Sequence, residues 1–264
     1  MKRQFLCAFA MLVAIPLMAQ ENRTSADPED GKSLQDKIQN PIANMASIPL
    51  DYNLSINNKN SNILNLQAVI PVRLTENWLL ITRAFVPFMN VPTTSSYSNG
   101  VGNVMFTGTI TPAKEGSFSW GAGPALMLPT GIEGLGFEKF SIGPSLAALK
   151  QSNGLTYGLI LQNYFSVAGP SNAQNVNYLY TQILLSKNLK NGWYLYSNPN
   201  ITADWNATNN NQWTIPLGVG AGKLITHNRY LPINVKAGVY KFIAHPTDAD
   251  WLIQAQATFI LKYK

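Results

Sequence analysis

The chain has 264 residues, of which 46% are hydrophobic and only 12% are charged, and its formal net charge is +6. Soluble domains usually carry about 25% charged residues, so this composition argues against an ordinary cytosolic enzyme. The aromatic content of 11% is too high for a disordered chain. The basic residues are scattered along the sequence rather than clustered, which disfavours a nucleic-acid-binding protein.

Residues 1–19 have the pattern of a secretory signal peptide. Two basic residues precede the apolar run from Leu6 to Leu17, and the small residue Ala19 precedes the expected cleavage site. A retained anchor helix is the alternative, but the run is shorter than the ~18 apolar residues that span a bilayer, and no stop-transfer charges follow it. Cleavage would remove Cys7, the single cysteine. The mature chain then has no disulfide and no cysteine metal site.

Residues 20–46 are expected to form a polar leader with a short helical segment. Ser33 is a candidate N-cap because Asp36 follows it by three residues, and Pro41 limits the length of the helix. We expect this part to form a short periplasmic or barrel-entrance segment rather than a domain.

From residue 47 to the end, apolar and other residues alternate. The residues Ile48, Leu50, Tyr52, Leu54 and Ile56 are one example. A period of two indicates strands with one apolar face. Twelve such segments are expected, at 47–57, 63–74, 78–89, 102–112, 117–129, 138–149, 155–168, 176–188, 193–205, 213–225, 230–243 and 251–263.

The lengths and connections of these segments predict an all-β fold, an antiparallel transmembrane β-barrel over residues 47–264. The segments have about 11 to 14 residues, whereas strands of soluble sheets average about 5 to 6 and a tilted membrane-spanning strand needs about 9 to 11. Short turns alternate with longer loops, as in outer-membrane barrels with periplasmic turns and extracellular loops. We therefore expect a location in a bacterial outer membrane. A soluble secreted β-sandwich is the alternative that strand length disfavours.

The tryptophans support the same fold. All six lie near strand ends, where two aromatic girdles at the lipid–water interfaces would place them. The short-turn ends carry Trp78, Trp120 and Trp193, and the long-loop ends carry Trp205, Trp213 and Trp251.

Eight prolines inside the predicted strands do not fit a regular barrel. Proline cannot donate to a ladder, and a closed barrel has no free edge. Some of them are therefore expected at bulges or strand ends. They are Pro49, Pro71, Pro87, Pro124, Pro144, Pro199, Pro216 and Pro232.

Strand parity predicts the residues that line the barrel interior, because a charge facing lipid at the midplane costs about 2 to 4 kcal/mol for Arg or Lys. A channel lining and a purely structural polar network are equally compatible with this pattern. The expected lining includes Asp51, Arg73, Arg83, Gln162, Asp204, Lys236, Gln254 and Gln256.

Glycines share the inward parity, among them Gly218, Gly220 and Gly222. A GxGxG pattern inside an alternating strand, with no helix after it, does not cradle phosphate. Such small residues instead leave room in the lumen or allow sharp curvature. A narrow pore that residues 21–45 block is one possibility.

Several short motifs occur in an order that resembles a family of bacterial outer-membrane β-barrels. They include Gln39 to Asn44, Trp120 to Pro124, Leu128 to Gly131, Ile142 to Ser145 and Trp213 to Gly220. The family is named after meta-pathway phenol degradation, and its members are often labelled transporters or misnamed neuromedin U. The resemblance covers residues 39–264 and implies passage of small, aromatic or hydrophobic molecules. It implies no catalytic or binding residue.

The expected function is therefore a passive channel or transporter for small molecules. The alternatives are a structural barrel without transport and an outer-membrane hydrolase. For a hydrolase, His245 lies near Asp248 and Asp250 in the last long loop, a grouping that chance explains; His227 lies in a turn. We expect no enzyme activity, cofactor or metal. The expected partners are outer-membrane lipid, an unidentified small-molecule permeant and the barrel-assembly machinery, with no nucleic acid.

Overall fold

The computed structural model describes residues 33–93, 96–132, 134–208, 211–227, 230–246 and 249–263. The expected signal peptide, and the leader up to residue 32, lie outside the described residues. Among the residues described, no helix is long and apolar enough to cross a membrane.

The described residues form a sheet of fourteen strand segments and very little helix. The helical elements are α2 (Leu34–Lys37) and the 3-10 turn η1 (Lys190–Gly192). The strand segments are β1 (Met45–Ile56), β2 (Ser61–Arg73), β3 (Trp78–Pro92), β4 (Tyr97–Val101), β5 (Met105–Pro112), β6 (Phe118–Met127), β7 (Phe140–Ser152), β8 (Leu155–Ala168), β9 (Asn177–Asn188), β10 (Trp193–Ser197), β11 (Asn200–Asp204), β12 (Trp213–His227), β13 (Tyr230–Ala244) and β14 (Trp251–Tyr263).

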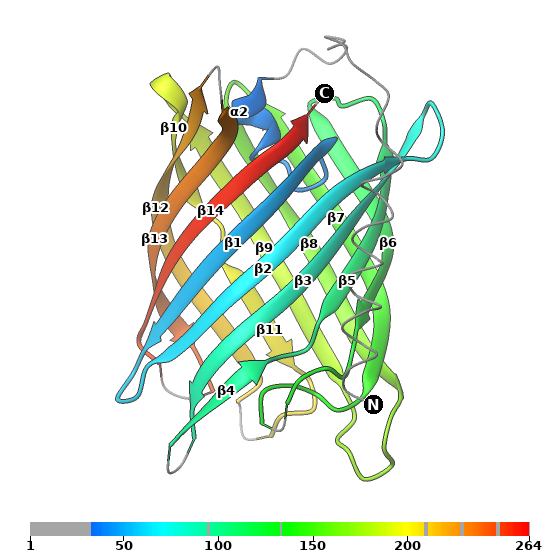
Figure 1. Ribbon diagram of the computed structural model, residues 1–264, viewed down its shortest axis with the longest axis vertical. Helices are drawn as coiled ribbons and strands as arrows, with labels where there is room; N and C mark the ends of the chain where they lie inside the picture. Colours follow the sequence, from blue (N-terminus) through cyan, green and yellow to red (C-terminus); the bar gives the residue numbers. More distant parts are fainter. Residues whose placement is uncertain are drawn as a thin grey trace. The chain divides into compact units, whose positions relative to one another are not determined.

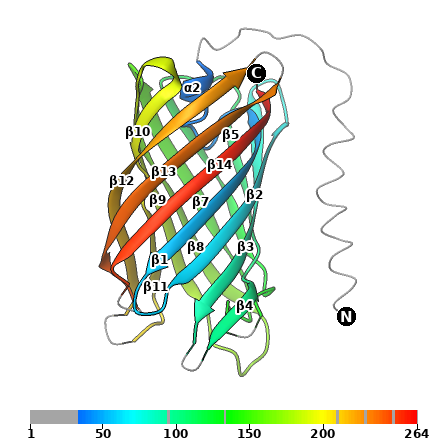
Figure 2. The same ribbon diagram turned by 60° about the vertical axis from the view of Figure 1, so that its left-hand side comes forward.

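The segments build a closed barrel of twelve antiparallel strands (Figures 1 and 2). β4 and β5 both pair with β3, and β10 and β11 both pair with β9 on one side and β12 on the other. Each of these two pairs is therefore one barrel strand broken in the middle. β1 pairs with β14 and closes the ring. The predicted all-β transmembrane barrel fold and its twelve strands are confirmed.

Four of the eight prolines lie where the ladder is interrupted. Pro199 separates β10 from β11. Pro87 lies opposite the break between β4 and β5, and its carbonyl oxygen accepts a hydrogen bond from the amide of Gly102 at 3.0 Å. Pro216 and Pro232 lie at register shifts in the pairing of β12 with β13. Where the ladder is interrupted, a residue does not have to donate a backbone N–H to a neighbouring strand. Proline, which has no N–H, is therefore tolerated there.

The two ends of the barrel differ. At one end the strands are joined by tight turns, two of which contain an Asn-Gly pair with positive φ. These are Asn153-Gly154, with φ of 52° and 71°, and Asn191-Gly192, with φ of 57° and 76°. This geometry matches the right-handed twist of hairpin strands. The longer connections lie at the other end (Figure 1).

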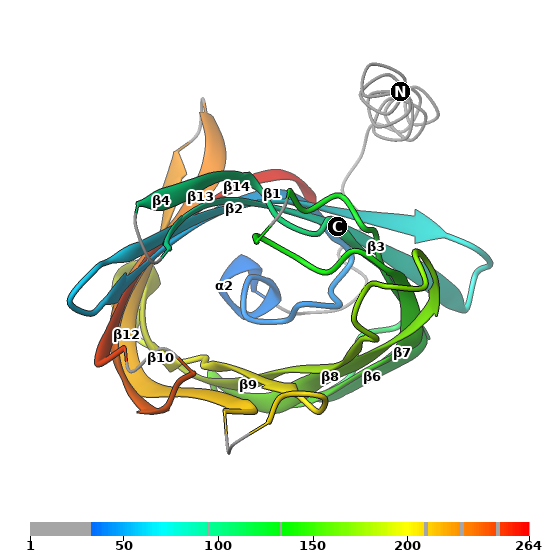
Figure 3. The same ribbon diagram turned by 90° about the horizontal axis from the view of Figure 1, so that it is seen from below.

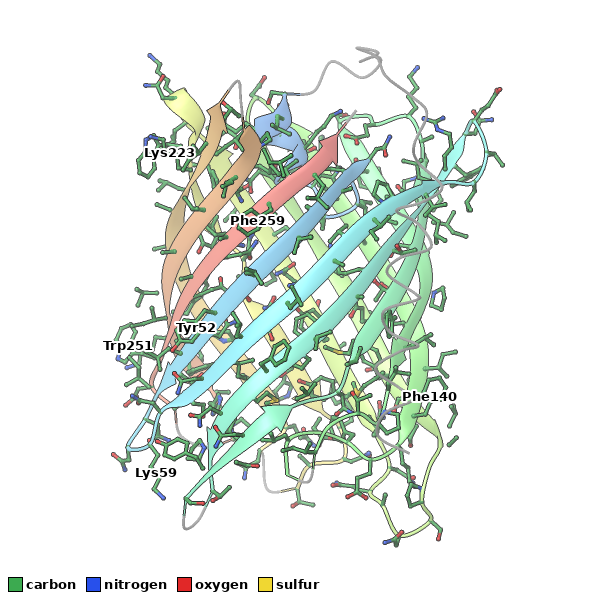
Figure 4. The ribbon with its side chains drawn as sticks, in the orientation of Figure 1. Tyr52, Lys59, Phe140, Lys223, Trp251 and Phe259 are labelled. Carbon is green, nitrogen blue, oxygen red and sulfur yellow. The ribbon has the colours of Figure 1, made fainter. Side chains whose placement is uncertain are left out.

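The outer surface of the barrel is apolar, because large hydrophobic side chains on the outward parity are exposed. Val219 is 72% exposed and Ile243 is 64% exposed. Figure 4 shows Tyr52, Phe140 and Trp251 pointing away from the interior. In water such a surface would be costly, whereas lipid accommodates it.

The six tryptophans all lie on this outward parity, near strand ends. Trp78 packs edge-on against Trp120, with ring centroids 6.0 Å apart, and Trp205 packs against Trp213 at 5.3 Å. The ammonium of Lys223 lies 4.9 Å from the ring centroid of Trp193. Amphipathic rings with cations beside them are typical of the membrane interface.

The segment that precedes β1 lies inside the barrel, at the short-turn end (Figure 3). Ser33 caps α2, because its hydroxyl accepts a hydrogen bond from the amide of Asp36 at 3.1 Å and donates to the Asp36 carboxylate at 2.8 Å. The helix has only four residues. Residues 33–44, here called the inner segment, thus lie in the barrel opening, where Ile42 and Ala43 are buried against strand side chains.

Candidate functional site: the barrel interior

The barrel encloses a cavity of about 560 Å³. Its lining comes from the inward-facing residues of most strands, from the inner segment and from the connection between β6 and β7. A space of this size is typical of small-molecule sites. The cavity is therefore the candidate functional site.

Polar contacts hold the inner segment against the wall. The side chain of Asn188 donates to the Asp36 carboxylate at 2.8 Å, and that of Gln151 donates to the Asp36 carbonyl oxygen at 2.9 Å. The side-chain amide of Gln35 donates to the carbonyl oxygen of Trp193 at 2.8 Å. These bonds join the segment to β7, β9 and β10.

An apolar layer lies beside these contacts. Ile42 is buried with side chains from five strands, namely Val69, Leu79, Ile81, Ala147, Leu149, Ile160 and Leu184. On the other side of the segment, Ala43 packs with Met45, Leu224 and Ile260. At this level the interior around Ile42 is a packed apolar core.

At the long-loop end, the connection between β6 and β7 bends inward over the mouth of the barrel (Figure 3). Asn103 fixes it, because its side-chain amide donates to the carbonyl oxygens of Leu128 and Phe137 at 2.6 and 2.8 Å. Its side-chain oxygen accepts from the amide of Phe137. Leu135 and Phe137 line the cavity as a result. The cavity is thus narrowed at both ends.

Carboxamides dominate the polar part of the lining. Thirteen Asn and Gln residues line the cavity, but only three charged residues do so, Asp51, Arg83 and Lys236. Tyrosines contribute as well, namely Tyr164, Tyr178, Tyr180 and Tyr194. The interior therefore carries many hydrogen-bonding groups and little net charge.

Six of the eight residues expected in the lumen line this cavity: Asp51, Arg83, Gln162, Lys236, Gln254 and Gln256. Arg73 and Asp204 do not. Arg73 lies at the end of β2 and donates to the carbonyl oxygen of Glu76 in the adjacent turn at 3.3 Å. Asp204 ends β11, and its carboxylate accepts from the amide of Asn206 at 3.0 Å. Both have inward parity, but they lie at the rims, where a strand end meets its connection.

Arg83 projects inward from the middle of β3 and reaches the inner segment. Its guanidinium donates to the carbonyl oxygen of Pro41 at 3.1 Å. The Arg83 side chain therefore holds the inner segment, and it also lines the cavity.

Sequence reasoning missed three inward tyrosines that fill the space over the glycines of β12 and β13. A Cβ added at Gly222 would overlap the ring of Tyr194, one at Gly220 the ring of Tyr196, and one at Gly218 the ring of Tyr240. The glycines thus accommodate aromatic rings and do not widen the lumen. The signal was present, because Tyr194 and Tyr196 share the parity that faces the glycine stripe.

The residues suggested for hydrolysis do not form a site in the described structure. The ring of His245 packs on Phe242 with centroids 4.4 Å apart. Asp248 lies outside the described residues, as does the side chain of His227. Within the described ranges, no group of three or more His, Cys, Asp or Glu side chains is placed to hold a metal ion.

No known protein-family model matches the sequence, and no curated protein matches it. Solved structures do match the fold. An outer membrane channel from Pseudomonas putida F1 has a TM-score of 0.65 at 15% identity, over 90% of this chain and 100% of the channel. The NanC porin has a TM-score of 0.54 at 8% identity, over 82% of this chain and 99% of the porin. The shared fold is that of outer-membrane barrels, and together with the apolar outer surface it gives the chain a location in a bacterial outer membrane.

Proposed function

We propose that the protein is a passive outer-membrane channel for small polar or aromatic molecules, and that the inner segment closes its periplasmic end. The observation that carries this proposal is the cavity of about 560 Å³, which has polar side chains on its wall and residues of the inner segment in its lining. A barrel with a purely structural role would have no need of an interior of this size, since side chains fill small barrels completely.

The chemistry of the lining favours small permeants that form several hydrogen bonds and carry at most one charge. Carboxamides and tyrosine hydroxyls offer both donors and acceptors, while Phe85, Met89 and Phe137 offer apolar contact. A ring with polar substituents would meet both kinds of wall. This supports the narrower proposal that the chain functions like the phenol-degradation barrels that its motifs resemble, with an aromatic or hydrophobic permeant.

The inner segment gives a direct test, because the mature chain would contain no cysteine of its own. Asn40 donates to the hydroxyl of Ser119 on β6 at 3.4 Å, and both residues are buried. With Asn40 and Ser119 replaced by Cys, a short bis-thiol-reactive linker should lock the segment in place.

The measurement is single-channel conductance of the folded full chain in planar bilayers. We expect openings in the unlinked protein and none in the linked protein, with recovery when a reducible linker is cleaved. The single-cysteine variant Ser119→Cys, treated identically, controls for modification of the wall. A folded barrel that never conducts, even after the segment is released, would favour the structural role.

A further inference from the structure

A row of polar side chains crosses four neighbouring strands on the inner wall. Lys236 on β13 pairs with Gln256 on β14, Gln256 pairs with Asp51 on β1, and Asp51 pairs with Asn65 on β2. In the adjacent inward row, Gln254 pairs with Asn53. All six residues line the cavity.

The hydrogen bonds within this group use side-chain N–H donors and leave several side-chain oxygens without a donor. The side-chain amide of Asn53 donates to Asp51 Oδ2 at 2.8 Å, and that of Asn65 donates to the same oxygen at 3.4 Å. The amide of Gln254 donates to the side-chain oxygen of Asn53 at 3.1 Å. The amide nitrogens of Asn65 and Gln254 are thus directed at neighbouring side chains.

Three oxygens of the group have no donor among the described residues. They are Asp51 Oδ1, Asn65 Oδ1 and Gln254 Oε1. Their side chains are 4%, 8% and 6% exposed. Buried hydrogen-bond acceptors in native proteins nearly always receive a hydrogen bond. A buried acceptor that receives none destabilises the fold, and the cost is largest for a carboxylate oxygen.

Lys236 does not satisfy them. It interacts electrostatically with Asp51, but its ammonium lies over the ring of Tyr196, 4.9 Å from the centroid. Asp51 Oδ1 therefore has no hydrogen-bond donor among the described residues.

We propose that Asp51, Asn65 and Gln254, together called the acceptor triad, form a binding subsite for the primary ammonium group of a small organic molecule. An ammonium has three N–H donors and one positive charge. The acceptor triad offers three acceptor oxygens and one negative charge. The tyrosine and carboxamide wall around the cavity contacts the remainder of the ligand.

This inference rests on the proposed function, because it names one class of permeant for the same cavity. Binding is nevertheless measured without conduction. If the ligand binds but the channel does not conduct, the subsite stands and the transport proposal fails. If the channel conducts but the ligand does not bind, the transport proposal stands and the subsite fails.

The experiment is calorimetric titration of the folded full chain in detergent with ethylammonium and, as a charge-matched probe, tetramethylammonium, which has no N–H donor. We expect ethylammonium to bind at least tenfold more tightly. Equal binding would show that charge alone attracts the cation, and would overturn the proposal, as would selective binding of a neutral diol.

Three variants locate the site. Asp51→Asn removes the charge and should weaken ethylammonium binding by about tenfold or more, the scale of a charged hydrogen bond. Gln254→Met removes one acceptor at similar volume and should weaken it several-fold, which keeps the test decisive if Asp51→Asn does not fold. Lys236→Met should strengthen binding, because a like charge is removed. Asn163→Leu changes a carboxamide that does not line the cavity and should have no effect; unchanged binding in both acceptor-triad variants would place the ligand elsewhere.

Discussion

The guanidinium of Arg83 donates to the carbonyl oxygen of Pro41 at 3.1 Å and so connects the middle of β3 to the inner segment. The same side chain therefore carries a charge of the cavity wall and holds the inner segment in place. Because this bond is not part of the sheet ladder, it can be lost without opening the barrel.

Replacing Arg83 with Glu should increase conductance and shift selectivity toward cations. The substitution removes the donor to Pro41, places a carboxylate beside that carbonyl oxygen, and leaves the cavity with two acids and one base in place of the reverse. Reversal potentials across a salt gradient measure the selectivity, and heat-modifiable gel mobility measures folding. No change in either conductance or selectivity would show that the pore is closed by other means.

Val86 lies on the same strand as Arg83 but on its opposite face. Its parity directs it to lipid, so Val86→Arg should impair folding, since an arginine facing the bilayer midplane costs about 2 to 4 kcal/mol. Heat-modifiable mobility checks this as well. If Val86→Arg folds normally and Arg83→Glu does not, the two faces of β3 have been assigned the wrong way round.

Ile42 should hold the inner segment in place by apolar packing, whereas Arg83 holds it by a hydrogen bond. It is 6% exposed within the apolar layer, so Ile42→Asp would bury a carboxylate there and should release the segment while the ladder stays intact. Limited proteolysis should then cleave the released residues, and conductance should rise. Ile42→Val, which costs only about 0.5 to 1.5 kcal/mol, should remain closed.

The sequence predicted the barrel well because the decisive signal is periodic. Alternation along β1 and β14 follows from one face meeting lipid and the other facing inward, so strand number and the inward parity of Asp51, Arg83 and Gln254 follow from counting. The broken strands were not predicted, because Pro199 and Pro87 interrupt pairing without interrupting alternation.

The site was less predictable than the fold. Apolar inward residues such as Leu79 and Ile81 form a packed layer only because Ile42 enters the barrel, and no local pattern in β3 shows that partner. In the same way, the sequence places Asn103 in a predicted strand at 102–112, and only the fold brings the connection between β6 and β7 against its side chain. Both features depend on contacts between distant parts of the chain.

The orientation in the membrane should place the tight turns in the periplasm. An epitope tag in the connection between β3 and β4 should be labelled on whole cells, whereas a tag at residues 75–77 should be labelled only after the outer membrane is permeabilised. This follows the usual arrangement of short periplasmic turns and longer external loops. The reverse labelling would place the inner segment at the external face.

The free energy of unfolding of the barrel should depend on the fit between the glycines of β12 and the inward tyrosine rings. A side chain at Gly222 would overlap the ring of Tyr194, whose hydroxyl donates to Asn234 at 2.9 Å. Gly222→Val should therefore lower the free energy of unfolding by about 1 to 3 kcal/mol, as overpacking does in close-packed interiors. Gly108→Ala is the matched control, since the nearest atom to an added Cβ, on Leu80, is 3.4 Å away, and stability should hardly change.

Denaturant unfolding of the folded barrel in lipid vesicles measures both variants. In the double variant with Tyr194→Ala, Gly222→Val should cost much less than it does alone, because the ring that it meets has been removed. If instead the two substitutions are additive, the glycine is required for the curvature of β12, and the tyrosine merely occupies the space that curvature leaves.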